Sequence, residues 1–380
     1  MKYSGIMRIG FKLLVNDKAK FSALLIGITF AVFLMVQMTS MFAGILNRAY
    51  STVTNIGASM WIMDPAVFTP TSSIPLPDYL LDSVRSMDGV SYAVPIFVGG
   101  ALVKLESGTY QSVTVVGLDD NSLFGRPELE QGNIKDIYAD NSFVVVNDSE
   151  FSKMESPKMG TSFQLNDHRG VVVGIAKVAQ STLNGVPTLY TTYSRAIEYI
   201  PTTRFTDSYV LVQAKNDDAI PGIKKQVAKL GYVAYTKEEF DKSVANYYTY
   251  KTGIGTNILL MTIISFIVGL SISGQTFYTF ILENLEKFGA LKAIGAKGSE
   301  LVYMILFMAT FTALTGYGLG VGLCALAIYL ARLRLPDYAA MITFWNLELA
   351  FGMVIFIAGF SSYVGIRRVL NIEPFEIFRG

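Results

Sequence analysis

Few residues in this sequence have the types and spacing that catalysis or metal binding requires. His168 is the only histidine, so any Ser-His-Asp triad would depend on it, and its polar neighbours at 166–170 favour a turn between two strands. No Gly-Lys-Ser or Gly-Lys-Thr occurs, so the phosphate-binding loop of ATPases is absent. No histidine and cysteine cluster has the spacing of zinc ligands. We therefore expect a chain that is not an enzyme and that holds no cofactor or metal of its own.

The most distinctive polar segment is 283–297, which mixes acidic, basic and apolar residues with two glycines. The spacing of its apolar residues predicts an amphipathic helix, but a solvated connection between two helices would have the same pattern. The residues of interest in this segment are Glu283, Leu285, Glu286, Lys287, Phe288, Gly289, Leu291, Lys292, Ile294, Gly295 and Lys297.

Four long apolar stretches without charged residues must position this segment: 21–47, 252–282, 301–331 and 349–366. Charged residues make up only 16% of the chain, against about 25% in a typical soluble domain. A helix of about 20 apolar residues crosses a hydrocarbon core of about 30 Å, and in lipid its backbone must satisfy its own hydrogen bonds. The sequence therefore predicts an α-helical membrane protein with four transmembrane helices.

The distribution of charge predicts the orientation of these helices. Segments 1–20, 283–300 and 367–380 together hold 11 basic and 6 acidic residues, whereas 48–251 holds 18 basic and 22 acidic residues. Since Lys and Arg concentrate on the cytoplasmic side, we expect a multi-pass protein of the bacterial inner membrane with both termini cytosolic and 48–251 periplasmic. Arg332 and Arg334, in the predicted outer loop 332–348, fit this orientation less well.

The N-terminal segment 1–20 mixes basic and apolar residues. This composition suits an amphipathic helix on the inner leaflet, and equally a cytosolic extension of the first span. Both interpretations remain open from the residues alone.

The segment 48–251 has the pattern of a large mixed α/β domain. Helical and strand spacings alternate at both of its ends, and its middle is rich in Val, Thr and Gly. We expect a split α/β subdomain, roughly 63–120 and 205–240, with a β-rich subdomain inserted at 121–200. Two separate strands are predicted at 92–98 and 101–105. The only cysteine, Cys324, lies in the third span, so this domain has no disulfide.

Segment 283–297 resembles the signature of the MacB/FtsX-type permeases, the mechanotransmission class of ABC transporters. The matching residues are Glu283 six positions before Gly289, Lys292 three after it, and then Ala293, Gly295 and Ala296. The C-terminal Arg367, Arg368, Pro374, Glu376 and Arg379 are similar to the family's ending. The order of one span, a large domain and three spans is also similar.

Within this family, residues 275–279 and 288–292 are most similar to the DevC branch. MacB carries a fused N-terminal ATPase, whereas about twenty residues precede the first span here. MacB also usually has Glu at the position of Lys287. These differences favour the branch in which the permease is a separate subunit.

The resemblance implies that 284–297 is a coupling helix seated in a cleft of a separate ABC ATPase subunit, which binds the ATP and Mg. Leu285, Phe288, Leu291 and Ile294 would supply the face buried in that cleft. Glu286, Lys287, Lys292 and Lys297 would form its polar rim.

Other partners follow from the same resemblance. It implies a homodimer in membrane lipid, a periplasmic HlyD/MacA-type adaptor and an outer-membrane tunnel protein. Closure of the two ATPases would then drive a lever-like change in the outer domains. Nucleic acid is not expected, because no basic stripe is interleaved with aromatic residues.

Three functions remain open within the family. The first is export of a lipid, glycolipid, peptide or drug through an adaptor. The second is an FtsX-like regulator that transmits force to a cell-wall hydrolase, and the third is a Lol-like permease that extracts lipoproteins. The β-rich insert at 121–200 favours the first function over the smaller outer domain of FtsX. No polar pocket within the spans identifies a substrate.

Overall fold

The computed structural model describes residues 2–178, 183, 185–200, 208–335 and 337–371. The chain divides into two units, Met1–Gly44 with Ile254–Gly380, and Ile45–Gly253. We call the first the membrane unit and the second the head. The expected family ending with Pro374, Glu376 and Arg379 lies outside the described residues.

Four long apolar helices dominate the membrane unit. Its described helices are α1 (Lys2–Asn16), α2 (Lys18–Ala49, which continues into the head), α8 (Gly253–Glu283), α9 (Leu285–Ala293), α10 (Gly298–Arg334) and α11 (Phe344–Leu370). Of these, α2, α8, α10 and α11 have 32, 31, 37 and 27 residues, and each contains an 18-residue stretch with mean hydropathy between 1.7 and 2.2. At about 1.5 Å per residue each exceeds a hydrocarbon core of about 30 Å. The predicted class, four candidate membrane-crossing helices with a mixed α/β domain, is confirmed.

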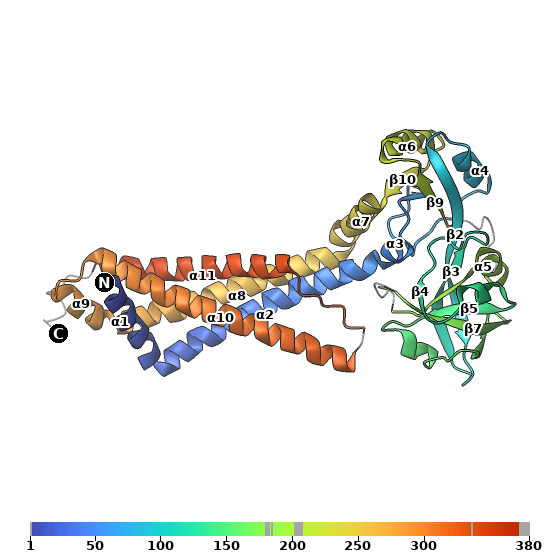
Figure 1. Ribbon diagram of the computed structural model, residues 1–380. Helices are drawn as coiled ribbons and strands as arrows, with labels where there is room; N and C mark the ends of the chain where they lie inside the picture. The colour runs from blue at the N-terminus through green and yellow to red at the C-terminus, as the bar shows by residue number, and fades with distance from the viewer. Residues whose placement is uncertain (1, 179–182, 184, 201–207, 336, 372–380) are drawn as a thin grey trace. The chain divides into compact units, whose positions relative to one another are not determined.

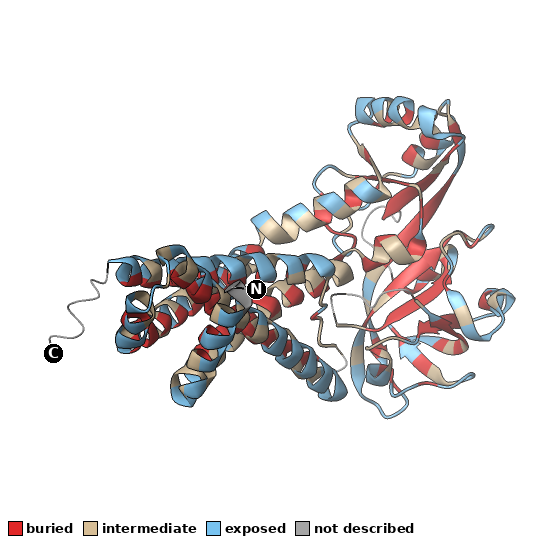
Figure 2. Ribbon diagram, turned by 60° about the vertical axis from the view of Figure 1, so that its left-hand side comes forward, coloured by how far each residue is buried: buried red, intermediate tan, exposed pale blue. Residues whose placement is uncertain are grey.

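The sides of these helices that face one another form the core of the membrane unit. Figure 2 shows buried residues along the inner sides and exposed residues outside. Small residues allow a close approach of α10 to α2, since a β-carbon on Gly316 or Gly320 would lie 2.6 Å from a side-chain carbon of Ile28 or Val32. Packing of this kind takes the place of the hydrophobic effect between helices in lipid.

The connection between α10 and α11 is shorter than the predicted loop 332–348. Helix α10 continues to Arg334, and α11 begins at Phe344, because Thr343 caps it by accepting a hydrogen bond from the backbone N–H of Asn346 at 3.3 Å. Arg332, whose predicted outer position fitted poorly, donates to the carbonyl of Ala340 at 2.6 Å.

This connection lies directly against α2. The backbone N–H of Met341 donates to the carbonyl of Ser40 at 2.8 Å. A β-carbon on Gly44 would lie only 1.1 Å from the carbonyl oxygen of Ala339, so only glycine fits there. The end of α2 in the membrane unit is therefore bound to the α10–α11 connection by backbone contacts.

The head is built on one sheet, which has ten strands among the described residues, in the order β10-β1-β9-β2-β3-β8-β5-β7-β4, with β6 pairing with β2 and β7. The strands are β1 (Met60–Met63), β2 (Val90–Lys104), β3 (Tyr110–Leu118), β4 (Glu128–Gly132), β5 (Ser142–Val146), β6 (Ser162–Leu165), β7 (His168–Lys177), β8 (Thr188–Thr192), β9 (Tyr209–Ala214) and β10 (Val233–Thr236). The apolar β5 is buried along its whole length, whereas the edge strand β4 carries Glu128 and Glu130 and is mostly exposed.

Short helices cover this sheet, as Figure 1 shows for α4 and α6 near β2 and β10 and for α5 near β3. They are α3 (Ser51–Ile56), α4 (Tyr79–Arg85), α5 (Tyr193–Tyr199), α6 (Ile220–Lys229) and α7 (Lys237–Asn246), with 3-10 turns η1 (Ile134–Tyr138), η2 (Phe151–Met154) and η3 (Asp217–Ala219), and a π-helical turn η4 (Tyr247–Lys251). Helix α7 begins at a capping box, in which Thr236 and Glu239 exchange side-chain to backbone hydrogen bonds of 3.3 and 2.9 Å.

The head has two lobes that share strand β2. Val90–Ile96 pairs with β9 in the α/β lobe, and Phe97–Lys104 pairs with β3 in the β-rich lobe. The strands predicted at 92–98 and 101–105 are thus one strand, because Gly99 and Gly100 stay paired with β3.

The subdomain boundaries therefore differ from those expected at 63, 120 and 205. Strand β1, which starts at Met60, belongs to the α/β lobe, whereas β3 belongs to the β-rich lobe through its parallel pairing with β8. One continuous sheet joins the lobes through β2. Parts of the predicted segments, 179–182, 184 and 201–207, lie outside the described residues.

Candidate functional site

Segment 283–297 forms a short helix between two turns. Helix α8 ends at Glu283 and α9 begins at Leu285, with Asn284 between them donating its side-chain N–H to the carbonyl of Phe280 at 2.8 Å. Gly295 ends α9 with φ +105°, a conformation that favours glycine. Ala296 N–H donates to the carbonyl of Leu291 at 3.0 Å, and Gly295 N–H donates to that of Lys292 at 3.1 Å. These are the two bonds of a Schellman motif, which explains the Gly-Ala pair of the signature.

One side of α9 packs into the membrane unit. Phe288 is 0% exposed, Gly289 is buried, and Leu285 and Leu291 pack partly buried against the same core. The Lys292 ammonium donates to the carbonyl of Leu370 at 3.1 Å, at the last turn of α11, where a cation also complements the helix dipole. Helix α9 is therefore fixed to α8 and α11 rather than suspended in solvent.

The other side of α9 is exposed. Ile294 is 86% exposed, the highest value among the large apolar side chains of the described chain. Ala290 and Ala293 are exposed beside it. Glu286 and Lys287, which lie one turn before Ala290 on the same side of the helix, are also exposed. We call Glu286, Lys287, Ala290, Ala293 and Ile294 the outward face of α9. Ile294 thus lies at one end of this face and the charged pair at the other, and apolar and charged groups together are usual in a protein-binding surface.

The structure places part of the expected docking surface inside the membrane unit. Phe288 was expected to face an ATPase, but it has no exposed surface because the chain's own core encloses it. Leu285 and Leu291 also turn inward, and Lys292 bonds α11, so of the four apolar residues only Ile294 is available to a partner. Lys297 is exposed as expected, and its N–H donates to the Glu300 carboxylate at 2.9 Å at the start of α10.

Sequence reasoning missed Ala290 and Ala293 because small side chains give no hydrophobic signal. Their spacing from Glu286, four and seven residues, was the available clue. Gly289 and Gly295 serve packing and the turn rather than the outward face.

Glu283 has an intramolecular partner. The Lys20 ammonium pairs with the Glu283 carboxylate, so the start of α2 is tied to the end of α8. The same ammonium lies 2.9 Å from the Asp17 carboxylate. The hydrogen bond from the Lys20 side chain holds the pKa of Asp17 below its ordinary value, although burial opposes the shift. Exposed pairs of this kind orient elements more than they stabilise them.

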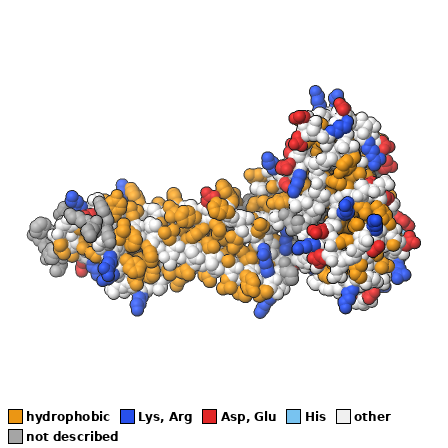
Figure 3. Space-filling view, viewed as in Figure 1, with side chains coloured by type: hydrophobic (Ala, Val, Ile, Leu, Met, Phe, Trp, Pro, Cys, Tyr) orange, Lys and Arg blue, Asp and Glu red, His pale blue; other side chains and the backbone are white. Residues whose placement is uncertain are grey.

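Figure 3 shows basic side chains gathered at the end of the membrane unit where α1 and α9 lie.

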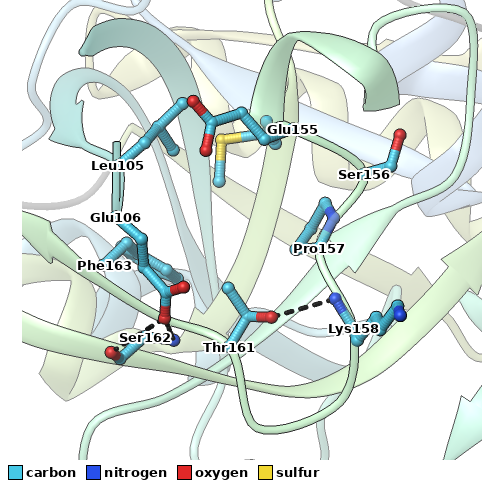
Figure 4. Close-up of a pocket in the computed structure, with 10 residues that line it drawn as sticks. Leu105, Glu106, Glu155, Ser156, Pro157, Lys158, Thr161, Ser162 and Phe163 are labelled. Carbon is cyan, nitrogen blue, oxygen red and sulfur yellow. Dashed lines mark hydrogen bonds between the residues drawn. The ribbon is translucent and has the colours of Figure 1, made fainter. Parts of the chain in front are cut away.

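The head offers a pocket of about 190 Å³ in the β-rich lobe (Figure 4). It lies between the β2–β3 turn and the segment that follows η2. Its polar groups bond one another: Ser162 N–H donates to Glu106 at 3.2 Å, and Lys158 N–H donates to the Thr161 hydroxyl at 3.0 Å. The first bond ties the β2–β3 turn to the start of β6, where the Ser162 hydroxyl also donates to the Glu106 carboxylate at 3.4 Å. The second bond lies within the segment after η2.

His168 lies in the polar turn that the sequence predicted. Asn166 and Asp167 have φ +46° and +71°, and Leu165 pairs with His168 across the β6–β7 hairpin. The imidazole stacks on Tyr199 with 4.5 Å between ring centres. Among the described residues no group of three or more His, Cys, Asp or Glu side chains could hold a metal ion.

Three features define the class of the protein. It has four candidate membrane-crossing helices, a large head between the first and second of them, and a short helix with one exposed side between the second and third. It is a multi-span membrane protein with one large extramembrane domain. Two family descriptions match the chain: MacB-like periplasmic core domain over residues 22–230 and FtsX-like permease C-terminal over residues 258–374. The first match covers more than half of the chain, which therefore belongs to the MacB/FtsX-type ABC transporter permeases.

Relatives of similar length support this assignment. An uncharacterised ABC transporter permease of Mycobacterium tuberculosis, Rv0072, is 25% identical over 360 residues, which cover 91% of this chain and 93% of the relative. An uncharacterised ABC transporter permease of Methanocaldococcus jannaschii, MJ1507, is 20% identical over 402 aligned positions, covering 100% and 99% of the two chains.

Two solved structures are similar to part of the chain. The extracellular domain of YknZ from Gram-positive bacteria covers 47% of this chain and 99% of its own, with 15% identity and a TM-score of 0.36. The periplasmic region of MacB from Actinobacillus actinomycetemcomitans covers 50% and 95%, with 14% identity and a TM-score of 0.38.

Proposed function

We propose that the outward face of α9 docks into a separate ABC ATPase subunit, which binds the ATP and Mg and supplies the energy. The observation that carries this proposal is the position of Ile294, an almost fully exposed apolar side chain, with Glu286 and Lys287 about two turns away on the same side of α9. An exposed isoleucine at the end of a short helix gains stability only when a partner covers it. The charged rim would set the register of docking more than its affinity.

The contacts of α9 would carry the motion of the ATPase into the spans. Asn284 bonds the last turn of α8, and Lys292 bonds the last turn of α11. Phe288 packs into the core that these helices share with α2 and α10. A push on Ile294 would therefore move several spans together as packed elements, which is the basis of lever-like switching.

The proposed setting is a bacterial inner membrane, with α9 and both termini in the cytosol and the head in the periplasm. Two copies would form the working unit. In support, α8 exposes apolar side chains such as Leu260, Ile264 and Ile267, which suit contact with a second copy or with lipid. The β-rich lobe suits a HlyD/MacA-type adaptor leading to an outer-membrane tunnel, with export of a lipid, glycolipid, peptide or drug as the work performed.

The substitution Ile294→Asp tests the docking proposal. The chain would be reconstituted with the ABC ATPase that copurifies with the unmodified chain, and ATP hydrolysis would be measured with and without the permease. A carboxylate enclosed in an apolar cleft is strongly unfavourable, so we expect the stimulation to fall at least tenfold. Leu230→Asp, at an exposed leucine of the head, is the matched control and should leave the stimulation unchanged. Unaltered stimulation by the Ile294→Asp chain would rule out docking through this face.

A further inference from the structure

Helix α1 is a separate helix that lies on α10. It ends at Asn16, and Asp17 starts α2 by accepting a hydrogen bond from the backbone N–H of Lys20 at 3.3 Å. A β-carbon on Gly10 would lie 2.6 Å from the side chain of Met304, so the two helices are in close contact. Residues 1–20 therefore do not continue the first span as one unbroken helix, as Figure 1 also shows.

Apolar side chains hold α1 in place. Leu14 is fully buried in the core of the membrane unit. Phe11 meets Phe311 of α10 edge to face, with 5.1 Å between ring centres. The buried side of α1 is thus already occupied by its own chain, and its remaining surface is available to an outside partner.

The remaining surface of α1 is cationic at its centre and apolar on both sides. Arg8 and Lys12 lie one turn apart and are exposed. Ile9 on one side is 44% exposed and Phe11 on the other is 39% exposed. This arrangement is that of a helix lying in the membrane interface, with cations at the headgroups and apolar flanks in the acyl region.

The cations of this surface lack acidic partners. Within the described part of the chain, Arg8, Lys12 and the neighbouring Lys18 form no ion pair, whereas Lys20 pairs with Asp17 and Glu283. The apolar flank continues on α10, a candidate span, where Phe311 contacts Phe11 and stacks on the partly buried Phe307 with 6.2 Å between ring centres. An occupant that offers both phosphate and hydrocarbon fits this continuity, and a soluble acidic protein does not.

We propose that the exposed surface of α1 binds anionic phospholipid, with Arg8 and Lys12 holding headgroup phosphate and Ile9 and Phe11 contacting acyl chains. This binding is independent of the ATPase docking proposed above. Removal of both cations should abolish the preference for anionic lipid, since each charge near an anionic surface is worth about fivefold.

The test uses the full chain with the probe Ile9→Trp, reconstituted in vesicles of phosphatidylcholine and phosphatidylglycerol. Either the phosphatidylcholine or the phosphatidylglycerol is brominated, and quenching of tryptophan fluorescence is measured. The native Trp61 and Trp345 give a background that is measured in the chain without the probe. We expect brominated phosphatidylglycerol to quench the probe several-fold more than its mole fraction predicts, and millimolar inorganic phosphate not to reduce this preference.

Adding Arg8→Gln and Lys12→Gln should bring the two brominated lipids to equal quenching, and Arg8→Lys with Lys12→Arg should restore the preference. Lys104→Gln with Arg169→Gln removes two exposed cations from the head and is the control for net charge. Equal quenching in the chain with intact cations would overturn the proposal, as would a preference that survives the double Gln change. No ATPase is present in this assay, so its outcome is separate from that of ATPase docking.

Discussion

At the scale of single residues, two apolar side chains of α9 have opposite surroundings. Phe288 is enclosed by the membrane unit, and Ile294 is exposed to solvent six residues later. The first contributes to the stability of the permease itself, and the second is the residue through which we propose that it contacts the ATPase. Substitutions at the two positions should therefore have separable effects.

The substitution Phe288→Ala should destabilise the membrane unit. Truncating a fully buried phenylalanine costs about 3–5 kcal/mol, since it removes apolar contact and leaves a cavity. The measurement is the thermal unfolding midpoint of the full chain in detergent. Ile294→Ala is the matched control and should leave the midpoint unchanged. Equal midpoints for the Phe288→Ala and unmodified chains would show that Phe288 is not a core residue.

Asp241 on α7 gives the head a pH dependence. Burial raises the pKa of its carboxyl above the ordinary 3.8, although Lys237 opposes the shift. A raised pKa means that the folded head disfavours the ionised carboxylate. The resulting destabilisation is absent below pH 3.8 and develops fully as the pH rises through the folded-state pKa.

The substitution Asp241→Asn should therefore raise the unfolding midpoint of the head at pH 7 and leave it unchanged near pH 3. The intrinsic fluorescence of the buried Trp61 reports this transition, once the contribution of Trp345 is subtracted. A stabilisation that is the same at both pH values would contradict ionisation of Asp241 as its cause.

The segment that forms the candidate site could be located from the sequence, but the direction in which each side chain points could not. The spacing of Leu285, Phe288 and Leu291 requires one face of a helix to be buried. It does not say whether the burying surface is a partner or the chain's own core, because both offer the same apolar environment. The Gly295-Ala296 pair was informative for a different reason, since a positive φ is a local requirement of the turn.

At the scale of elements, the membrane unit depends on a backbone contact between α2 and the α10–α11 connection. Met341 donates to the Ser40 carbonyl, and the Ala339 carbonyl occupies the space beside Gly44. This contact holds α2 where it leaves the membrane unit. A substitution that adds one methyl group there should separate the two segments.

The substitution Gly44→Ala should therefore lower the thermal stability of the chain by about 1–3 kcal/mol or more, the usual cost of overpacking. Gly322→Ala, in α10, has open space around its position and is the matched control. It should be neutral or slightly stabilising, since alanine favours helix. The measurement is the fraction of monodisperse protein in detergent after heating, and equal losses for the two variants would contradict the contact.

The helices and strands were largely predictable where the apolar pattern in the sequence extends over many residues. The four spans are visible because some twenty apolar residues in a row exclude most other structures. The lobes of the head were less predictable, because strand pairing between distant segments decides them. Gly99 and Gly100 suggested a break, yet pairing with β3 carries β2 straight through both glycines.

At the scale of the whole molecule, the account assigns two tasks to two units. The membrane unit holds α9 and the spans, and the head holds a continuous sheet of two lobes. The central claim is that energy enters at α9 on one side of the membrane and produces work in the head on the other. This division requires α9 and the head to lie on opposite sides of the bilayer.

Labelling of single cysteines tests this claim most directly. In a Cys324→Ala background, Ile294→Cys and Lys135→Cys place one exposed thiol on α9 or on the head. A membrane-impermeant maleimide would be added to intact spheroplasts, before and after permeabilisation. The account predicts that the thiol at 135 is labelled at once and that the thiol at 294 is labelled only after permeabilisation. Labelling of both thiols in intact spheroplasts would contradict the transmission of energy from α9 to the head.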